Sequence, residues 1–137
     1  MTEKIYSRQE KGLLLHIVNR LDEITERTDI APEKEFLQLA TLKLPKGKTF
    51  RPHKHMWKDG ENKIIAQESW VVIKGKVKFI MYDIDDTIIG EKILNQGDCS
   101  MTFHGGHNYK VLENDTIIYE YKTGPYKGQK LDKEFIL

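Results

Sequence analysis

The pattern of apolar and polar positions changes near residue 35. Before this point, apolar residues recur at helical spacing, with charged residues between them. The pattern predicts a helix over 14–26, although Gly12 and the β-prone run "LLLHIV" argue against a longer one. We therefore expect residues 1–34 to form an N-terminal extension with a short helical segment. The apolar positions of this helix are Leu14, Ile17, Val18, Leu21 and Ile24.

From Glu35 onward, short runs typical of β-strands alternate with turn sequences. Runs such as "EFLQLATLKL", "VKFIMYDI" and "TIIYEYK" are separated by turns such as "PKG", "NQGD" and "END". About eight such strands follow at near-regular spacing, without room for crossover helices between them. Residues 35–137 are therefore predicted to form one all-β sandwich or barrel domain.

Composition and charge narrow the class of protein. The chain has 137 residues, of which 39% are hydrophobic and 31% charged, an ordinary balance for one soluble domain. A net charge of +1 with interleaved signs predicts neither a nucleic-acid partner nor a membrane partner. Cys99 is the single cysteine, which excludes an internal disulfide, and the first residues contain no apolar signal core. We expect a cytoplasmic protein.

The stretch "GKTFRPHKH" places His53 and His55 one residue apart. In an extended chain these two side chains point to the same face, and Lys54 points to the other. Two neutral imidazoles on one wall either bind a metal or stand in a polar pocket. Taken alone, the pair is also compatible with two surface residues, so the rest of the sequence has to decide.

The spacing of these histidines and of residues further along the chain resembles the two motifs of the cupin superfamily. The first motif runs Gly, five residues, His-x-His, three or four residues, Glu, six residues, Gly. The second begins with Gly and ends with a single His. Here "MWKDGENKIIAQ" lengthens the segment before the glutamate into a hairpin loop, and the usual proline of the second motif is missing. The matching residues are Gly47, His53, His55, Glu68 and Gly75, followed by Gly97 and His107.

The resemblance covers residues 36–123 and implies a cupin-type double-stranded β-helix, also called a jelly-roll barrel. A closer likeness to small single-domain cupins associated with bacterial surface-polysaccharide genes rests on "PHKH", "GDCS", "GGHNY" and "YKTGPY". The resemblance to the cupin superfamily implies a metal site made by His53, His55, Glu68 and His107. Three imidazoles and one carboxylate suit one divalent transition metal ion: Mn, Fe, Co, Ni or Zn.

Two neighbouring residues compete for places in this site. Glu61 lies nearer to the histidine pair but sits in the turn-like "KDGEN", whereas Glu68 heads the strand-like "ESWVVI". His104 lies three residues before His107 and could replace it. The double glycine directly before His107 permits close backbone approach, which favours that residue. The sequence leaves the choice between the two histidines open.

Strand parity also suggests residues that contact a small-molecule ligand. Arg51 and Trp57 share the face of the histidine pair, and Tyr109 shares that of His107. An arginine can anchor a carboxylate or phosphate, and a tyrosine can supply a hydrogen-bonding wall. Plain core packing is the alternative for the aromatic residues. The sequence assigns no catalytic base.

These features predict a metal-dependent cupin that acts on a small polar metabolite, such as a sugar or nucleotide sugar. The metal would polarise a carbonyl or enediolate oxygen while a pocket base moves a proton, as in isomerisation or epimerisation. The alternatives are an Fe(II)-dependent oxygenase, a non-catalytic metal-containing ligand-binding module and a metal-free epimerase. We expect a homodimer.

Overall fold

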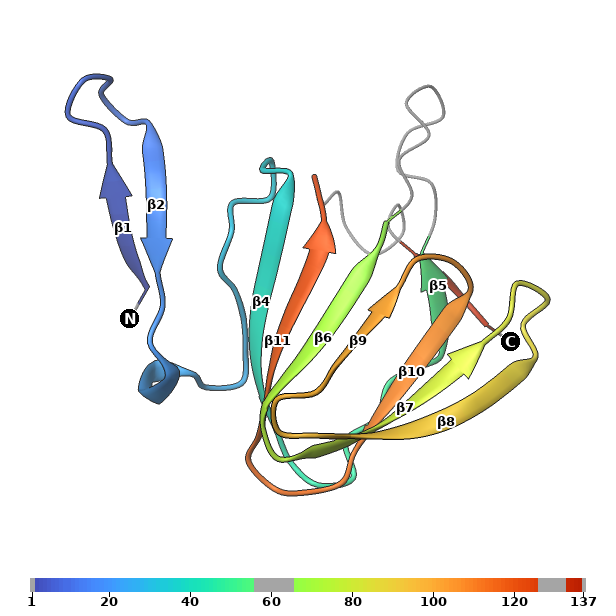
Figure 1. Ribbon diagram of the computed structural model, residues 1–137. Coiled ribbons are helices and arrows are strands. Elements are labelled where there is room, and N and C mark those ends of the chain that lie inside the picture. The colour runs from blue at the N-terminus through green and yellow to red at the C-terminus, as the bar shows by residue number, and fades with distance from the viewer. Residues whose placement is uncertain (1, 56–65, 126–132, 137) are drawn as a thin grey trace.

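The computed structural model describes residues 2–55, 66–125 and 133–136, with His55 described by its backbone alone. Two antiparallel five-stranded sheets face each other and account for most of this part of the chain (Figure 1). The sheets meet at the end drawn at the bottom of Figure 1 and spread apart toward the top. The all-β prediction is confirmed, as is the double-stranded β-helix arrangement.

Each sheet combines strands that are distant in the sequence, which is typical of a jelly roll. The first sheet has the order β3 (Arg27–Asp29), β4 (Leu37–Leu44), β11 (Thr116–Thr123), β6 (Glu68–Lys74) and β9 (Cys99–Thr102). The second has the order β12 (Lys133–Phe135), β5 (His53–His55), β10 (Gly106–Val111), β7 (Lys76–Tyr82) and β8 (Ile88–Asn95).

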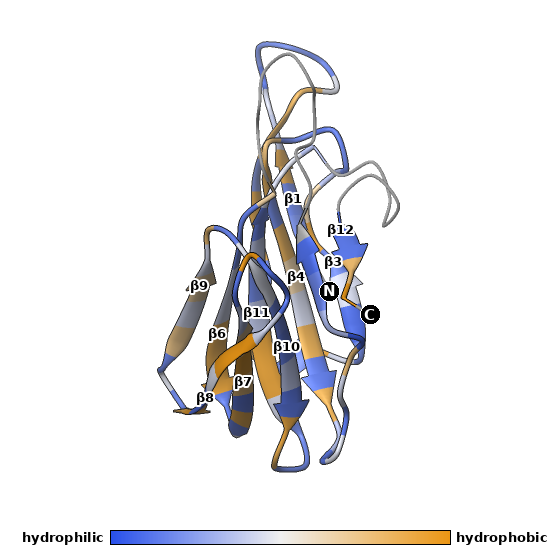
Figure 2. Cartoon of the chain, turned by 90° about the vertical axis from the view of Figure 1, so that its right-hand side faces the viewer, coloured by the Kyte–Doolittle hydropathy of each residue, from blue (hydrophilic) through white to orange (hydrophobic). Residues whose placement is uncertain are grey.

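The core lies between the inner faces of the two sheets. Alternate residues of each strand point inward, so hydrophobic and hydrophilic bands alternate along the strands (Figure 2). Trp70 of the first sheet stacks on Tyr109 of the second, with ring centroids 3.9 Å apart and an interplanar angle of 5°. Val72 and Val111 are fully buried near this pair. The aromatic contact therefore ties the two sheets together in the middle of the sandwich.

The N-terminal region corrects one prediction. Residues predicted to start a helix over 14–26 instead form strand β2 (Leu14–Val18), which pairs with β1 (Glu3–Tyr6) in a hairpin beside the first sheet (Figure 1). Only Leu21–Glu23 is helical there, as a single 3-10 turn. Along one edge, β2 pairs with β1, and a periodicity measured on one segment does not detect such a partner.

The N-terminal extension also supplies part of the first sheet. Strand β3 pairs with β4, with Arg27 opposite Leu42 and Asp29 opposite Ala40. The predicted boundary at residue 34 therefore lies between two paired strands, and the division into two regions stays a prediction. Within the described ranges, the chain forms no helix with the length and apolarity needed to cross a membrane. Most of the predicted hairpin loop after His55 lies outside the described residues.

Candidate metal centre

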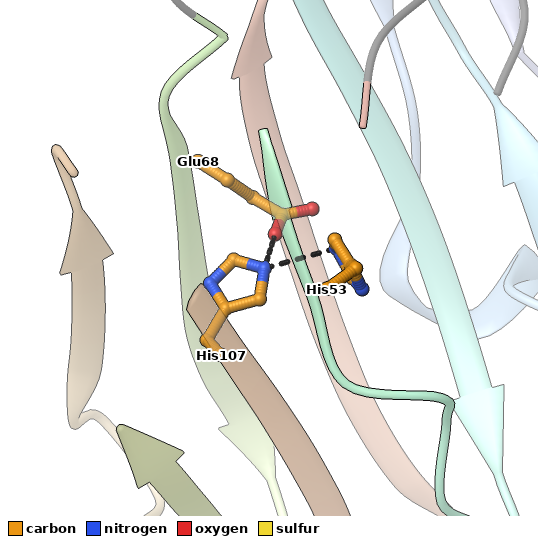
Figure 3. A group of neighbouring side chains, drawn as sticks. All are labelled: His53, Glu68 and His107. Carbon is orange, nitrogen blue, oxygen red and sulfur yellow. Dashed lines mark hydrogen bonds and ion pairs between the residues drawn. The ribbon is translucent and has the colours of Figure 1, made fainter. Parts of the chain in front are cut away.

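His53, Glu68 and His107 come together as a buried cluster (Figure 3). One ligand atom from each, two imidazole nitrogens and one carboxylate oxygen, lies within 4.8 Å of the others. The two histidines belong to the second sheet and the glutamate to the first, so the cluster lies between the sheets. The structure thus places together three of the four residues for which the cupin resemblance implies a metal site.

The two histidines face each other across paired strands. His107 of β10 lies directly opposite His53 of β5. Side chains at directly opposed positions of an antiparallel pair lie on the same face of the sheet. Their Nε2 atoms are 3.1 Å apart, and the rings meet edge-on at an interplanar angle of 89°.

Two glycines precede His107 at points where the backbone is closely packed. A Cβ atom on Gly106 would lie 2.9 Å from the carbonyl oxygen of His53 and would collide with the side chain of Ile136. Gly105 has a φ of +78°, and a Cβ there would lie 2.5 Å from the carbonyl oxygen of Tyr82. Only glycine fits both positions without displacing backbone, so Gly106 lets His107 lie close to β5 and Gly105 lets the chain enter β10 beside the end of β7.

Hydrogen bonds at the other ring nitrogen orient each histidine. His53 Nδ1 lies 3.2 Å from the backbone oxygen of Arg51. A carbonyl oxygen only accepts, so this Nδ1 carries the proton, and in the neutral ring Nε2 carries the lone pair. His107 Nδ1 lies 2.8 Å from Thr102 Oγ1, a hydroxyl that can donate or accept. Both rings thus direct Nε2 into the cluster, the arrangement typical of metal-binding histidines.

Glu68 completes the cluster from the opposite sheet. It is the first residue of β6, and its Oε2 lies 2.6 Å from His107 Nε2. Donor atoms that surround a divalent metal at about 2.1 Å lie about 3 Å from one another. The two separations from His107 Nε2, 2.6 Å to Glu68 and 3.1 Å to His53, are close to this spacing, and all three donor atoms lie within 4.8 Å of one another. The donor types also suit Mn, Fe, Co, Ni and Zn, so the residues fit a divalent transition metal.

A second carboxyl group lies behind Glu68. Glu120 of β11 is buried and forms a hydrogen bond with Glu68. Burial raises the pKa of Glu120 from 4.5 to about 7, and the negative charge of Glu68 adds to this rise. Arg27 opposes the rise because its Nη1 and Nη2 donate to Oε2 and Oε1 of Glu120 at 3.1 and 3.2 Å. Burial is the largest single influence on Arg27 and acts to lower its pKa, but the charges and hydrogen bonds of Glu120 and Asp29 together outweigh it and raise that pKa.

The predicted ligand-contact residues have different surroundings. Arg51 is exposed, and its guanidinium lies 4.4 Å from the ring centre of Phe135. Tyr109 is 2% exposed, its hydroxyl lies 2.8 Å from Ser100 Oγ, and its ring packs against His107. The structure therefore gives Tyr109 a packing role beside the cluster, and its contact with a ligand stays a prediction.

The remaining candidates lie outside the cluster or outside the described residues. His55 belongs to β5, where its backbone pairs with Lys133, and its side chain is not among those described. Trp57 and Glu61 fall in the segment beyond the described residues. His104 is exposed in the bend after β9 and is not one of the three clustered residues.

The sequence does not predict three residues around the cluster: Thr102 and Glu120, which contact it, and Arg27, which binds Glu120. The strand pattern contains a signal for two of these residues, Thr102 and Glu120. Thr102 and Glu120 occupy inward positions of β9 and β11, where alternation calls for apolar residues. A charged residue at an inward position, as in "TIIYEYK", indicates a special environment. Arg27 directly follows the predicted helix over 14–26, and the sequence pattern gives no sign that it begins a strand.

Comparisons with known proteins agree with this architecture. Neither a protein-family model nor a curated protein sequence matches the chain. Among solved structures, a conserved Klebsiella pneumoniae protein with a double-stranded β-helix domain superposes with a TM-score of 0.63 at 14% identity, over 96% of both chains. The cupin domain of Schizosaccharomyces pombe Cnp3 gives a TM-score of 0.61 at 11% identity, over 90% of this chain and 85% of that one.

A third similar structure is CapF, a capsular polysaccharide assembling protein from Staphylococcus aureus. It superposes with a TM-score of 0.60 at 18% identity, over 80% of this chain and 31% of its own. The chain therefore spans about a third of the CapF chain. At these identities the likeness shows the fold, and that fold is the double-stranded β-helix of the cupins. The chain therefore has the fold of the cupins, as the sequence resemblance predicts.

Proposed function

We propose that the protein is a metal-binding cupin that acts on a small polar metabolite, a sugar or nucleotide sugar, by isomerisation or epimerisation. The observation that carries the proposal is the buried cluster of His53, Glu68 and His107, whose donor types and separations fit a divalent metal. The sugar class is supported by the sequence likeness to cupins of surface-polysaccharide genes and by the fold shared with CapF.

Each residue of the proposed metal centre has a separate role in binding the ion. His53 and His107 offer Nε2 while the Arg51 carbonyl and the Thr102 hydroxyl orient their rings. Glu68 supplies the negative charge that favours a divalent cation, and His55 is the proposed fourth donor. A metal bound there supplies Lewis-acid chemistry that polarises a substrate oxygen. Arg51 is proposed to bind an anionic group of the substrate, because its guanidinium lies exposed just before β5.

A second candidate function follows from the donor set. The described cluster contains two imidazoles and one carboxylate, the combination used by non-haem Fe(II) oxygenases. If the side chain of His55 does not join the cluster, this set is complete with three ligands and leaves open positions for oxygen and substrate. An Fe(II)-dependent oxygenase is therefore the alternative to the isomerase or epimerase.

Native mass spectrometry of untagged protein, followed by a proton-exchange assay, tests the proposal. The mass spectrum reports the bound metal and checks the expected homodimer. The metal-loaded protein is then incubated in D2O with a panel of nucleoside diphosphate sugars, and 1H NMR follows the loss of sugar C–H signals. We expect loss of one C–H signal with wild type and with His16→Ala, and none with His53→Ala or His107→Ala.

Other outcomes of these experiments would support a different function. Oxygen consumption by the iron-loaded protein, without C–H exchange, supports the oxygenase. Binding of a sugar nucleotide with neither exchange nor oxygen consumption supports the non-catalytic module. Exchange that persists after removal of the metal contradicts a metal-dependent reaction.

A further inference from the structure

A line of charged side chains runs from the cluster to the edge of the first sheet. It begins with Glu68 on β6, continues through Glu120 on β11 and ends at Arg27 on β3. Glu68 lies opposite Lys122, two residues from Glu120, so the two glutamates are diagonal neighbours on one face of the sheet. All three residues come from different strands, and only the sheet register brings them together.

Arg27 reaches Glu120 across an intervening strand. Strand β4 lies between β3 and β11, and its residue opposite Glu120 is Ala40. The small side chain of Ala40 leaves space over the strand, and the Arg27 guanidinium donates to both oxygens of Glu120. This two-point contact fixes the plane of the carboxyl group as well as its position. Glu120 therefore meets Glu68 with a defined orientation.

We propose that Arg27 and Glu120 are positioning residues of the metal centre, which hold the Glu68 carboxyl group toward the Nε2 atoms of His53 and His107. This inference rests on the proposed metal binding and adds the partners that orient its carboxylate. Loss of a residue that orients a metal ligand typically weakens metal affinity 10–100-fold. Since Arg27 belongs to the N-terminal extension, residues 35–137 alone lack one part of the centre.

Titration of the full chain with Co2+, followed by visible absorption, tests the inference. Arg27→Lys keeps the charge but loses the two-point contact, and Glu120→Ala removes the hydrogen bond to Glu68. We expect each to raise the Kd for Co2+ about tenfold or more and to shift the absorption band at saturation. Glu120→Gln keeps an amide that can donate to Glu68 and one oxygen that accepts from Arg27, but it loses the second contact with Arg27, so its Kd and band should lie between those of wild type and Glu120→Ala.

Asp29→Asn is the matched control. It removes the other carboxylate bound by Arg27, a side chain that is 62% exposed, and leaves the contact with Glu120 in place. We expect it to keep the wild-type Kd and absorption band. Melting of each metal-free variant shows that the fold is retained, and Arg27→Lys provides the test even if Glu120→Ala fails to fold.

The results separate this inference from the proposed function. Wild-type affinity and an unchanged band in both Arg27→Lys and Glu120→Ala would overturn the positioning role and leave a structural ion pair. In that case the metal centre itself would stand. Wild-type protein that binds no Co2+ would overturn the metal centre, and the positioning role with it.

Discussion

His53 and His107 lie directly opposite each other on β5 and β10, with their Nε2 atoms 3.1 Å apart. Two neighbouring strands of one sheet thus deliver two nitrogen donors to the same point. Each ring is oriented from behind, one by a backbone carbonyl and the other by a hydroxyl. Rigid sheet structure of this kind holds ligands in place before a metal arrives, which lowers the cost of binding.

Loss of either clustered histidine should lower the metal content. We expect His53→Ala and His107→Ala each to lower the metal content of the purified protein strongly, and the His53→Ala, His55→Ala double variant to remove it. His16→Ala is the control, because this residue is exposed on β2 in the N-terminal hairpin. Elemental analysis gives the metal content per chain. Full occupancy in the double variant would contradict the site.

Glu68 should be the carboxylate ligand. Its side chain is buried and contacts His107, so Glu68→Gln removes the negative charge that favours a divalent ion. We expect metal affinity to fall about tenfold or more and turnover to be lost. Glu61→Gln should change neither, because the sequence places Glu61 in a turn. Metal titration of the two variants checks this, and the reverse result would move the ligand into the loop.

Gly106 should tolerate no side chain. An alanine Cβ there would crowd the His53 carbonyl oxygen at 2.9 Å and collide with Ile136, so β5 and β10 would have to separate. Overpacking of this kind costs about 1–3 kcal/mol, and metal binding should weaken as His107 moves. Urea unfolding and metal titration measure the two effects.

Gly90→Ala is the matched control for this substitution. Gly90 also lies within a strand, and a Cβ there would meet only the flexible end of Met81 at 3.8 Å. We expect Gly90→Ala to leave both the free energy of unfolding and the metal affinity unchanged. Equal losses in the two variants would show that any alanine for glycine in the sheets has the same effect.

The contribution of Glu120 to the stability of the metal-free protein should fall as the pH rises from 4.5 to about 7, the range over which the pKa of Glu120 is raised. Because the folded state holds this proton more tightly than the unfolded chain, folding favours the protonated form. The contribution is on the order of a few kcal/mol at most, and it is present at low pH and lost above the raised pKa. Charged and titratable groups that act on Glu120 are Glu68, Arg27 and Tyr109.

Glu120→Gln isolates this effect, since it cannot ionise while the other groups still titrate. Urea unfolding at pH 5 and pH 8 should show a larger loss of stability in wild type than in Glu120→Gln. An equal change in both proteins would mean that Glu120 has an ordinary pKa in the folded state.

Most of the fold after residue 35 could be predicted, because its strands carry their own alternation and end at turn residues. The N-terminal hairpin could not. Leu14–Val18 has apolar residues that also fit a helix, and only pairing with Glu3–Tyr6 makes it a strand. A local pattern does not contain the partner, so tertiary pairing overrides it.

The same limit applies to the site. His53, Glu68 and His107 could be predicted because a known spacing marks them in the sequence. Arg27 and Glu120 could not, because their contact joins positions 93 residues apart and depends on the order β3-β4-β11. Predicting that contact needs the sheet order and register as well as the strands.

The three clustered side chains span both sheets at the end where the sheets spread apart in Figure 1. An ion held there would tie β5 and β10 to β6, so that this end of the sandwich could no longer open without breaking coordination. Amide hydrogens of these three strands should then exchange with solvent more slowly in the loaded protein. Exchange at the opposite end, where the sheets already meet, should not change. The metal would then act as a cross-link between the two sheets at the end where the sheets themselves do not meet.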